Sequence, residues 1–74
     1  MLEKIENLSK RESEVLGLLA VGMKNADIAA QLGVSINTVK TQLKQVYRKL
    51  NVTSRYEAMS SYLLNQKNHS TTQL

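Results

Sequence analysis

Apolar residues recur at helical spacing in four successive stretches of this chain, and short polar segments separate the stretches. The pattern predicts helices at about 10–21, 26–32, 36–50 and 55–65. No stretch alternates apolar and polar residues between turn signals, which is the pattern of a half-buried strand. The sequence therefore predicts an all-α fold, a four-helix bundle-like domain that contains a helix-turn-helix.

Capping residues stand at the ends of the first and fourth predicted helices. Ser9 and Glu12 have the spacing of a capping box, in which a hydroxyl and a carboxylate each accept a hydrogen bond from a backbone N–H group at the helix start. Ser54 and Glu57 repeat that spacing. Gly22 should end the first helix, because Gly is common just after a helix.

A tight turn joins the second and third predicted helices. The apolar face of the short second helix consists of Ile28, Ala29 and Leu32. We expect Asn25 to cap this helix and Gly33 to end it, since Gly tolerates positive φ at no steric cost. Ser35 then stands where its hydroxyl can accept a hydrogen bond from an N–H group that opens the third helix.

The third predicted helix has two different faces. Its apolar residues recur at spacings of three and four and should face the core: Ile36, Val39, Leu43, Val46 and Leu50. On the other face, Lys40, Lys44 and Arg48 follow one another at every turn and form a cationic stripe about 12 Å long. Asn37 and Thr41 lie beside this stripe. A helix with such a face fits a groove that is edged by phosphates.

Charge is unevenly distributed along the chain, whose formal net charge is +4. The segment between Ile28 and Tyr56 has no acidic residue and five basic ones, namely Lys40, Lys44, Arg48, Lys49 and Arg55. Residues 1–27 carry four basic and five acidic residues. One alternative is that the basic residues of the stripe simply solvate an exposed helix, and this alternative remains open. An ordinary solvated helix, however, usually carries charges of both signs. The segregation favours a polyanionic partner.

Several classes of function lack the residues that they need. The chain has no Cys, so it has neither disulfides nor thiolate metal sites. His69 stands alone in a polar segment, and no nucleophile–base pair or phosphate-binding Gly loop is present. We expect no enzymatic activity, no cofactor, no metal and no small-molecule ligand. The first residues form no secretory signal and the longest apolar run is far too short to span a membrane, so we expect a soluble, cytoplasmic protein without membrane contact.

The ends of the chain differ from its middle. We expect a charged lead-in at 1–8, the folded domain at 9–65 and a disordered tail at 66–74, because this last segment is polar and unpatterned. In the fourth helix, Ala58, Met59 and Tyr62 fit one buried stripe. The residues left partly outside that stripe are a candidate dimer surface: Tyr56, Ser60, Leu63 and Leu64. The alternative is a loosely packed terminal helix.

A set of residues at fixed spacing runs from Leu8 to Ala58. It comprises residues 8–16 (LSKRESEVL), 19–22 (LAVG), 25–29 (NADIA), Leu32, Ser35, 38–40 (TVK), Lys49, Leu50, Val52, Arg55 and Ala58. This set resembles the LuxR-type helix-turn-helix domain, also called the NarL/FixJ or GerE type, of bacterial transcription regulators. The main departure from the family is at Gln42, where the family usually has His, while Val46 and Asn51 replace the more usual Ile and Gly conservatively.

The resemblance implies a four-helix DNA-binding domain whose third helix enters the major groove and whose fourth helix makes the dimer contact. It assigns the reading of base edges to Lys40, Thr41 and Lys44. Contacts with phosphates are assigned to Ser35, Asn37, Thr38, Arg48 and Lys49. The chemistry agrees, since Lys can donate to guanine O6 and N7, while hydroxyls and helix N-terminal N–H groups suit phosphate.

We therefore expect a sequence-specific, dimeric bacterial transcription regulator that binds double-stranded DNA. Other transcription regulators or RNA polymerase are further candidate partners. The alternative is a protein-interaction module that pairs with larger regulators through the fourth helix and modulates their DNA binding. A small nucleic-acid enzyme is less favoured than either, because the sequence shows no acidic cluster or set of metal ligands.

Overall fold

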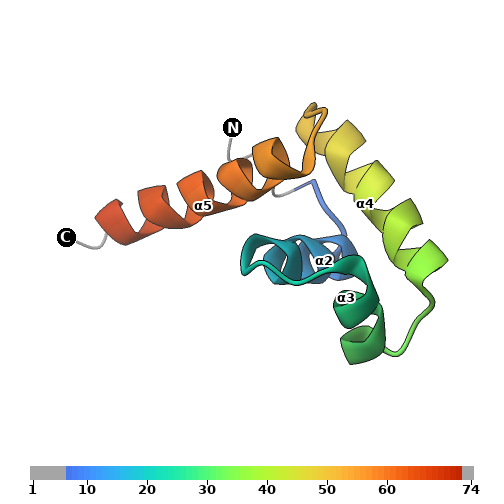
Figure 1. Cartoon of the computed structure of the whole chain (residues 1–74). Coiled ribbons are helices and arrows are strands. Elements are labelled where there is room, and N and C mark those ends of the chain that lie inside the picture. The colour runs from blue at the N-terminus through green and yellow to red at the C-terminus, as the bar shows by residue number, and fades with distance from the viewer. Residues whose placement is uncertain (1–6, 73–74) are drawn as a thin grey trace.

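The computed structural model describes the backbone of residues 7–72 and the side chains of residues 7–64. It contains four helices, α2 (Lys10–Ala20), α3 (Asn25–Leu32), α4 (Ile36–Leu50) and α5 (Arg55–Thr72), and no strand within the described residues. Figure 1 shows α4 along one side of the molecule and α5 leaving from the C-terminal end of α4 to pass α2. The prediction of an all-α domain with a helix-turn-helix is confirmed.

Hydrogen bonds at the helix starts follow the sequence signals in part. The capping box of α2 is complete, since Ser9 N–H donates to Glu12 Oε1 (2.9 Å) and Glu12 N–H donates to Ser9 Oγ (3.0 Å). At α5, Glu57 N–H donates to Ser54 Oγ (3.2 Å). The Glu57 carboxylate, however, accepts the N–H of Thr53 (2.7 Å), one residue earlier than a capping box requires.

The start of α3 differs from the prediction. Asn25 was expected to be its cap, and this is wrong: Lys24 occupies the cap position with extended backbone, and its side chain makes no capping hydrogen bond. Asn25 is the first residue of the helix, and its side-chain oxygen accepts a hydrogen bond from Arg55 of α5 (3.3 Å). A tertiary contact therefore uses the polar group that a local cap would have used.

The end of α5 also differs from the prediction. The helix extends to Thr72, whereas the sequence led us to expect an end near residue 65 and disorder at 66–74. No Gly or Pro follows Ser54, so neither of the two residue types that most disfavour a helix interrupts α5. Residues 1–6 of the expected lead-in and 73–74 of the expected tail lie outside the described residues.

Helices α2, α3 and α4 all end in the same way. A residue with left-handed backbone follows each helix closely: Gly22 (φ 95°), Gly33 (φ 71°) and Asn51 (φ 58°). The next N–H group then donates to the carbonyl five residues earlier, from Met23 to Leu18 (3.2 Å), from Val34 to Ala29 (3.0 Å) and from Val52 to Tyr47 (2.9 Å). This is the Schellman motif, which turns the chain and places an apolar residue against the helix it has left. Met23, Val34 and Val52 accordingly pack against the core.

Most of the expected core residues are buried. Helix α2 contributes Val15, Leu16 and Leu19, α3 contributes Ile28 and Ala29, α4 contributes Val39, Leu43, Val46 and Leu50, and α5 contributes Ala58. The prediction that Ile36 belongs to this core is wrong, because its side chain is 43% exposed. Ile36 is the first residue of α4, and side chains on a helix tilt toward its N-terminus, so that of Ile36 extends past the end of the helix.

Candidate nucleic-acid interface

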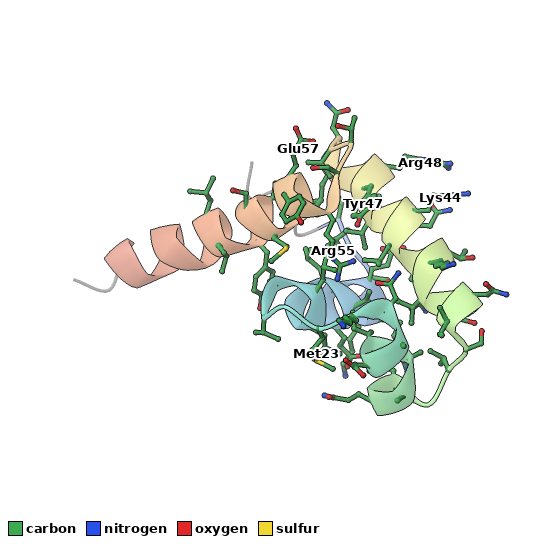
Figure 2. All side chains as sticks on the ribbon, viewed as in Figure 1. Met23, Lys44, Tyr47, Arg48, Arg55 and Glu57 are labelled. Atoms are coloured by element: carbon green, nitrogen blue, oxygen red, sulfur yellow. The ribbon has the colours of Figure 1, made fainter. Side chains whose placement is uncertain are left out.

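The outward face of α4 carries the cationic stripe that the sequence predicted. Lys40, Lys44 and Arg48 are exposed, as are Asn37 and Thr41 beside them. At 3.6 residues per turn these five positions span about 100° of the helix circumference. Figure 2 shows Lys44 and Arg48 extending from α4 away from the other helices. The buried residues of α4 occupy the opposite face, so packing against α2, α3 and α5 fixes the direction in which the stripe points.

Polar groups without a negative charge gather at the N-terminus of α4. Ser35 Oγ accepts the N–H of Thr38 (3.1 Å) and lies 2.9 Å from Thr38 Oγ1. The first turn of α4 contains no acidic residue. The free N–H groups and the dipole of the helix therefore leave this end positive, which suits a phosphate group.

Lys49 differs from the other cations of α4. Its Nζ donates a hydrogen bond to Glu12 Oε1 at 2.8 Å and so joins the last turn of α4 to the start of α2. This hydrogen bond and that from Ser9 N–H hold the pKa of the Glu12 carboxyl below its usual value. By contrast, Lys40, Lys44 and Arg48 have no ion-pair partner among the described residues.

Arg55 likewise acts within the protein. Its guanidinium donates to the main-chain oxygen of Met23 (2.8 Å) and to Asn25 Oδ1 (3.3 Å), so it joins the start of α5 to the segment between α2 and α3 (Figure 2). The sequence grouped Arg55 with the other basic residues. No local signal could have separated it, because its partners are 32 and 30 residues away along the chain.

Comparison with known proteins identifies the domain. Residues 6–62 match the family described as bacterial regulatory proteins, luxR family. The chain belongs to the LuxR family. It is a transcription-regulator helix-turn-helix domain, and membership of this family implies DNA binding.

Relatives of this LuxR-family domain are much longer proteins. The chain is 43% identical over 68 residues to the probable transcriptional regulatory protein SgaR of Hyphomicrobium methylovorum, covering 90% of this chain and 32% of SgaR. It is 38% identical over 60 residues to the transcriptional activator RamA of Corynebacterium glutamicum, covering 81% of this chain and 21% of RamA. It is 40% identical over 60 residues to the transcriptional regulator MalT of Vibrio cholerae, covering 81% of this chain and 7% of MalT. The chain thus spans about a third or less of these relatives. No solved structure matches it.

Gln42, the position at which this LuxR-family domain departs from the usual residue, is half-buried on α4. Its Oε1 atom is buried and has no hydrogen-bond partner. Buried polar atoms are usually paired, because an unpaired one loses its hydrogen bonds to water without replacement. The Gln42 side chain therefore leaves a buried hydrogen-bond acceptor unpaired on α4.

The four residues proposed from the sequence as a dimer surface are exposed on α5 in the LuxR-family domain. Tyr56 is 76% exposed, Leu63 52% and Leu64 50%, and Ser60 is exposed as well. Their spacings of three and four place them on one face of the helix. Ala58 is buried, and Met59 and Tyr62 are half-buried on the side that packs against the core.

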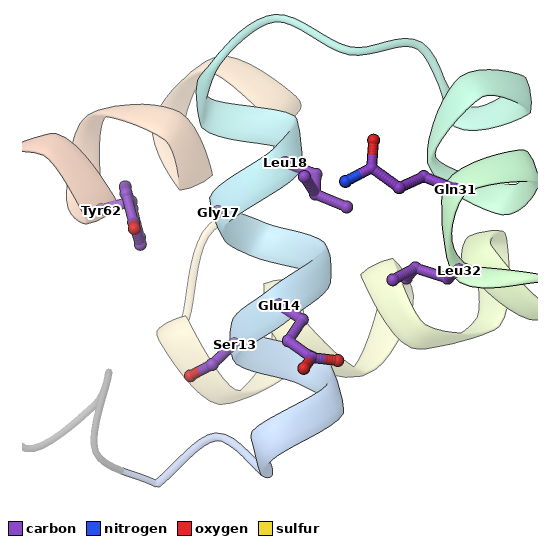
Figure 3. Close-up of a pocket in the computed structure, with 7 residues that line it drawn as sticks. All are labelled: Ser13, Glu14, Gly17, Leu18, Gln31, Leu32 and Tyr62. Atoms are coloured by element: carbon purple, nitrogen blue, oxygen red, sulfur yellow. The ribbon is translucent and has the colours of Figure 1, made fainter.

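The structure also contains an open pocket of about 340 Å³ on the surface of α2 (Figure 3). It is lined by Ser13, Glu14, Gly17, Leu18, Gln31, Leu32 and Tyr62. The Glu14 carboxylate lies 3.4 Å from Arg11 Nε, and the other lining residues include no Asp, Glu, Lys, Arg or His. Within the described residues, no group of three or more His, Cys, Asp or Glu could hold a metal ion. No helix in this part of the chain is both long and apolar enough to cross a membrane.

Proposed function

We propose that the chain binds double-stranded DNA sequence-specifically as a homodimer and thereby regulates transcription in the cytoplasm, without catalysing a reaction. The observation that carries this proposal is the outward stripe of Lys40, Lys44 and Arg48, which have no ion-pair partner among the described residues. A helix with such a face can enter the major groove, where cations on either side of it meet phosphates.

The positions on α4 support a division of roles. Lys40 and Thr41 lie in the first half of the helix and Lys44 just past its middle, all on its outward face, where a groove helix meets base edges. Phosphate contacts are proposed for Arg48 farther along the stripe and for Ser35, Asn37 and Thr38 at the positive end of the helix. A phosphate contact is less favourable for Lys49, since the phosphate would compete with Glu12 for the ammonium group of Lys49.

The proposed dimer forms through α5. Tyr56, Ser60, Leu63 and Leu64 present a partly apolar face that no other described segment of the chain covers. Burial of apolar surface stabilises a complex by about 25 cal/mol per Å², which would favour the pairing of two such faces. A dimer of this kind reads two half-sites about one helical turn apart on the same side of the duplex.

Selection from a pool of random duplexes at near-physiological salt tests this function. We expect the retained DNA to share a pseudo-palindrome with half-sites about 10 base pairs apart. If the dimer neutralises about 6–10 phosphates, its affinity should fall by roughly 10³–10⁵ between 50 and 200 mM salt. Retention without a shared motif, or an affinity that does not change with salt, would contradict the proposal.

A second candidate function rests on the same exposed face of α5. In this alternative, Leu63 and Leu64 pair with the corresponding helix of a larger regulator, and the chain modulates the DNA binding of that partner. Two results together would favour it over the first proposal: failure to retain DNA alone, and co-sedimentation with a full-length LuxR-family regulator.

A further inference from the structure

Ile36 is an apolar side chain in an otherwise polar setting at the start of α4. Of the exposed large hydrophobic side chains among the described residues, it alone belongs to α4. Exposed apolar residues are common on protein surfaces, so exposure by itself indicates no function. The position of Ile36 relative to the cationic stripe is what distinguishes it.

Ile36 borders Lys40, one of the residues proposed to read bases. Ile36 stands at the edge of the apolar face of α4, and Lys40, one turn farther along, is its neighbour on the helix surface. When a helix of a helix-turn-helix enters the major groove, its N-terminal residues contact the base edges. The first residue of α4 therefore reaches the groove together with Lys40.

The chemistry of the groove indicates what an isoleucine could contact there. Base edges in the major groove offer hydrogen-bond donors and acceptors, and their one apolar group is the 5-methyl of thymine. Lys40 can contact the acceptors, whereas Ile36 offers only methyl and methylene groups. We propose that Ile36 contacts the 5-methyl group of a thymine in each half-site and makes the domain specific for an A·T pair there; this inference rests on the proposed DNA binding through α4.

The spacing along α4 also limits where that thymine lies. Ile36 and Lys40 are four residues apart, which is about 6 Å along the helix axis. Base pairs follow one another every 3.4 Å or so. The thymine should therefore lie within about two base pairs of the base that Lys40 contacts.

Replacement of thymine by deoxyuridine tests the inference, since it removes the 5-methyl group and leaves the hydrogen-bonding edge intact. Each thymine of the selected half-site is replaced in turn, and the dissociation constant is measured by fluorescence anisotropy. We expect the unaltered protein to lose about three- to fivefold in affinity at one position, the effect of exposing one methyl group. Ile36→Ala should bind the two duplexes equally at that position, and Ile36→Val should keep part of the preference.

Two further variants complete the test, and the first of them is a control. Val21 is another β-branched apolar residue, 74% exposed, in the turn at the end of α2 that lies away from α4 in Figure 1. Val21→Ala should retain the full preference for thymine. Thr41, itself a proposed base reader, carries a methyl group on the outward face of α4, so Thr41→Ser, which keeps the hydroxyl, is the competing test: a loss of the preference for thymine in this variant would assign the methyl contact to Thr41 instead of Ile36. Circular dichroism and thermal unfolding establish that every variant is folded.

The outcomes separate this inference from the proposed function. If selection returns a site and no deoxyuridine weakens binding, DNA binding stands and the role of Ile36 is overturned. The same holds if the preference for thymine persists in Ile36→Ala or disappears in Thr41→Ser instead. If selection returns no site, the proposed function fails and the inference fails with it.

Discussion

The Nζ atom of Lys49 lies 2.8 Å from the Oε1 atom of Glu12, and the same oxygen accepts the N–H of Ser9 at 2.9 Å. A single carboxylate oxygen thus caps α2 and holds the last turn of α4, although Glu12 and Lys49 are 37 residues apart in the sequence. Because α4 carries the proposed DNA-binding face, this ion pair helps to fix that face relative to the rest of the domain.

Acid should destabilise the domain in part through Glu12. Its hydrogen bonds lower the pKa of the folded state below the unfolded value of about 4.3, so its stabilisation is complete above that pH and is lost as the pH falls through the folded-state pKa. Glu12→Gln should lower the free energy of unfolding by about 1–2 kcal/mol at pH 7. Urea unfolding should also show a smaller loss between pH 7 and pH 3 than in the unaltered protein.

A matched variant controls for the loss of a carboxylate in the same helix. Among the described residues, Glu14 forms an ion pair only with Arg11, across 3.4 Å between two half-exposed side chains. Glu14→Gln should therefore change the free energy of unfolding by less than about 1 kcal/mol and leave the effect of acid almost intact. Equal losses on acidification in Glu12→Gln and Glu14→Gln would show that Glu12 is not the source.

Lys40 and Arg48 should affect DNA binding differently. Lys40→Ala should weaken binding to the preferred site by about 1–3 kcal/mol and relax the preference at one or two base pairs, since it removes a base contact. Arg48→Ala should weaken all sequences alike and reduce the dependence on salt. Lys10→Ala, which removes an exposed cation from α2, controls for net charge. If Lys40→Ala lowers the affinity for every sequence equally, the assignment of Lys40 as a base reader is wrong.

Leu64→Asp should separate dimerisation from folding. Its side chain is 50% exposed, so an aspartate there should leave the monomer folded, while in the proposed dimer it would bury a charge between two copies of α5. We expect the dimer dissociation constant to rise tenfold or more in sedimentation velocity, with the far-UV circular dichroism unchanged. Val21→Asp introduces the same charge elsewhere and should leave dimerisation intact. An identical sedimentation profile for Leu64→Asp and the unaltered protein would contradict this interface.

Two glycines should respond to alanine in opposite ways. Gly33 has φ 71° and nothing within 4 Å of an added Cβ, so Gly33→Ala tests backbone strain alone and should cost about 1 kcal/mol. Gly17 lies inside α2, where an added Cβ would meet the Tyr62 hydroxyl at 3.4 Å, an ordinary contact. Gly17→Ala should therefore stabilise the domain by up to about 1 kcal/mol through helix propensity. Thermal unfolding should show midpoints shifted by several degrees in opposite directions; a lowered midpoint for Gly17→Ala would mean that Tyr62 cannot accommodate the methyl group.

Local signals in the sequence were enough to predict the helices and most of the proposed interface. The capping box of α2, the Gly33 turn and the periodicity of α4 each depend on residues within five positions of one another. They predicted the burial of Val39 and Val46 and the exposure of Lys40 and Lys44, as the structure shows.

The differences from prediction involve contacts between distant segments and the ends of helices. Asn25 accepts a hydrogen bond from Arg55 rather than capping α3, and no residue near Asn25 in the sequence indicates that Arg55 is its partner. Lys49 has the charge of a phosphate ligand and lies next to Arg48 on α4, and only the fold brings its side chain to Glu12. Ile36 fits the apolar period of α4, but the period does not show that the first residue of this helix extends beyond the core.

Arg55 is the first residue of α5, and its guanidinium holds the main chain just before α3. Any tilt of α5 must therefore stretch this contact or carry α3 along. In the proposed dimer, the two subunits meet on α5, so the distance between their two copies of α4 is set by a stiff connection rather than by a flexible arm. Such a dimer tolerates little change in the number of base pairs between its half-sites, which restricts the promoters that it can recognise.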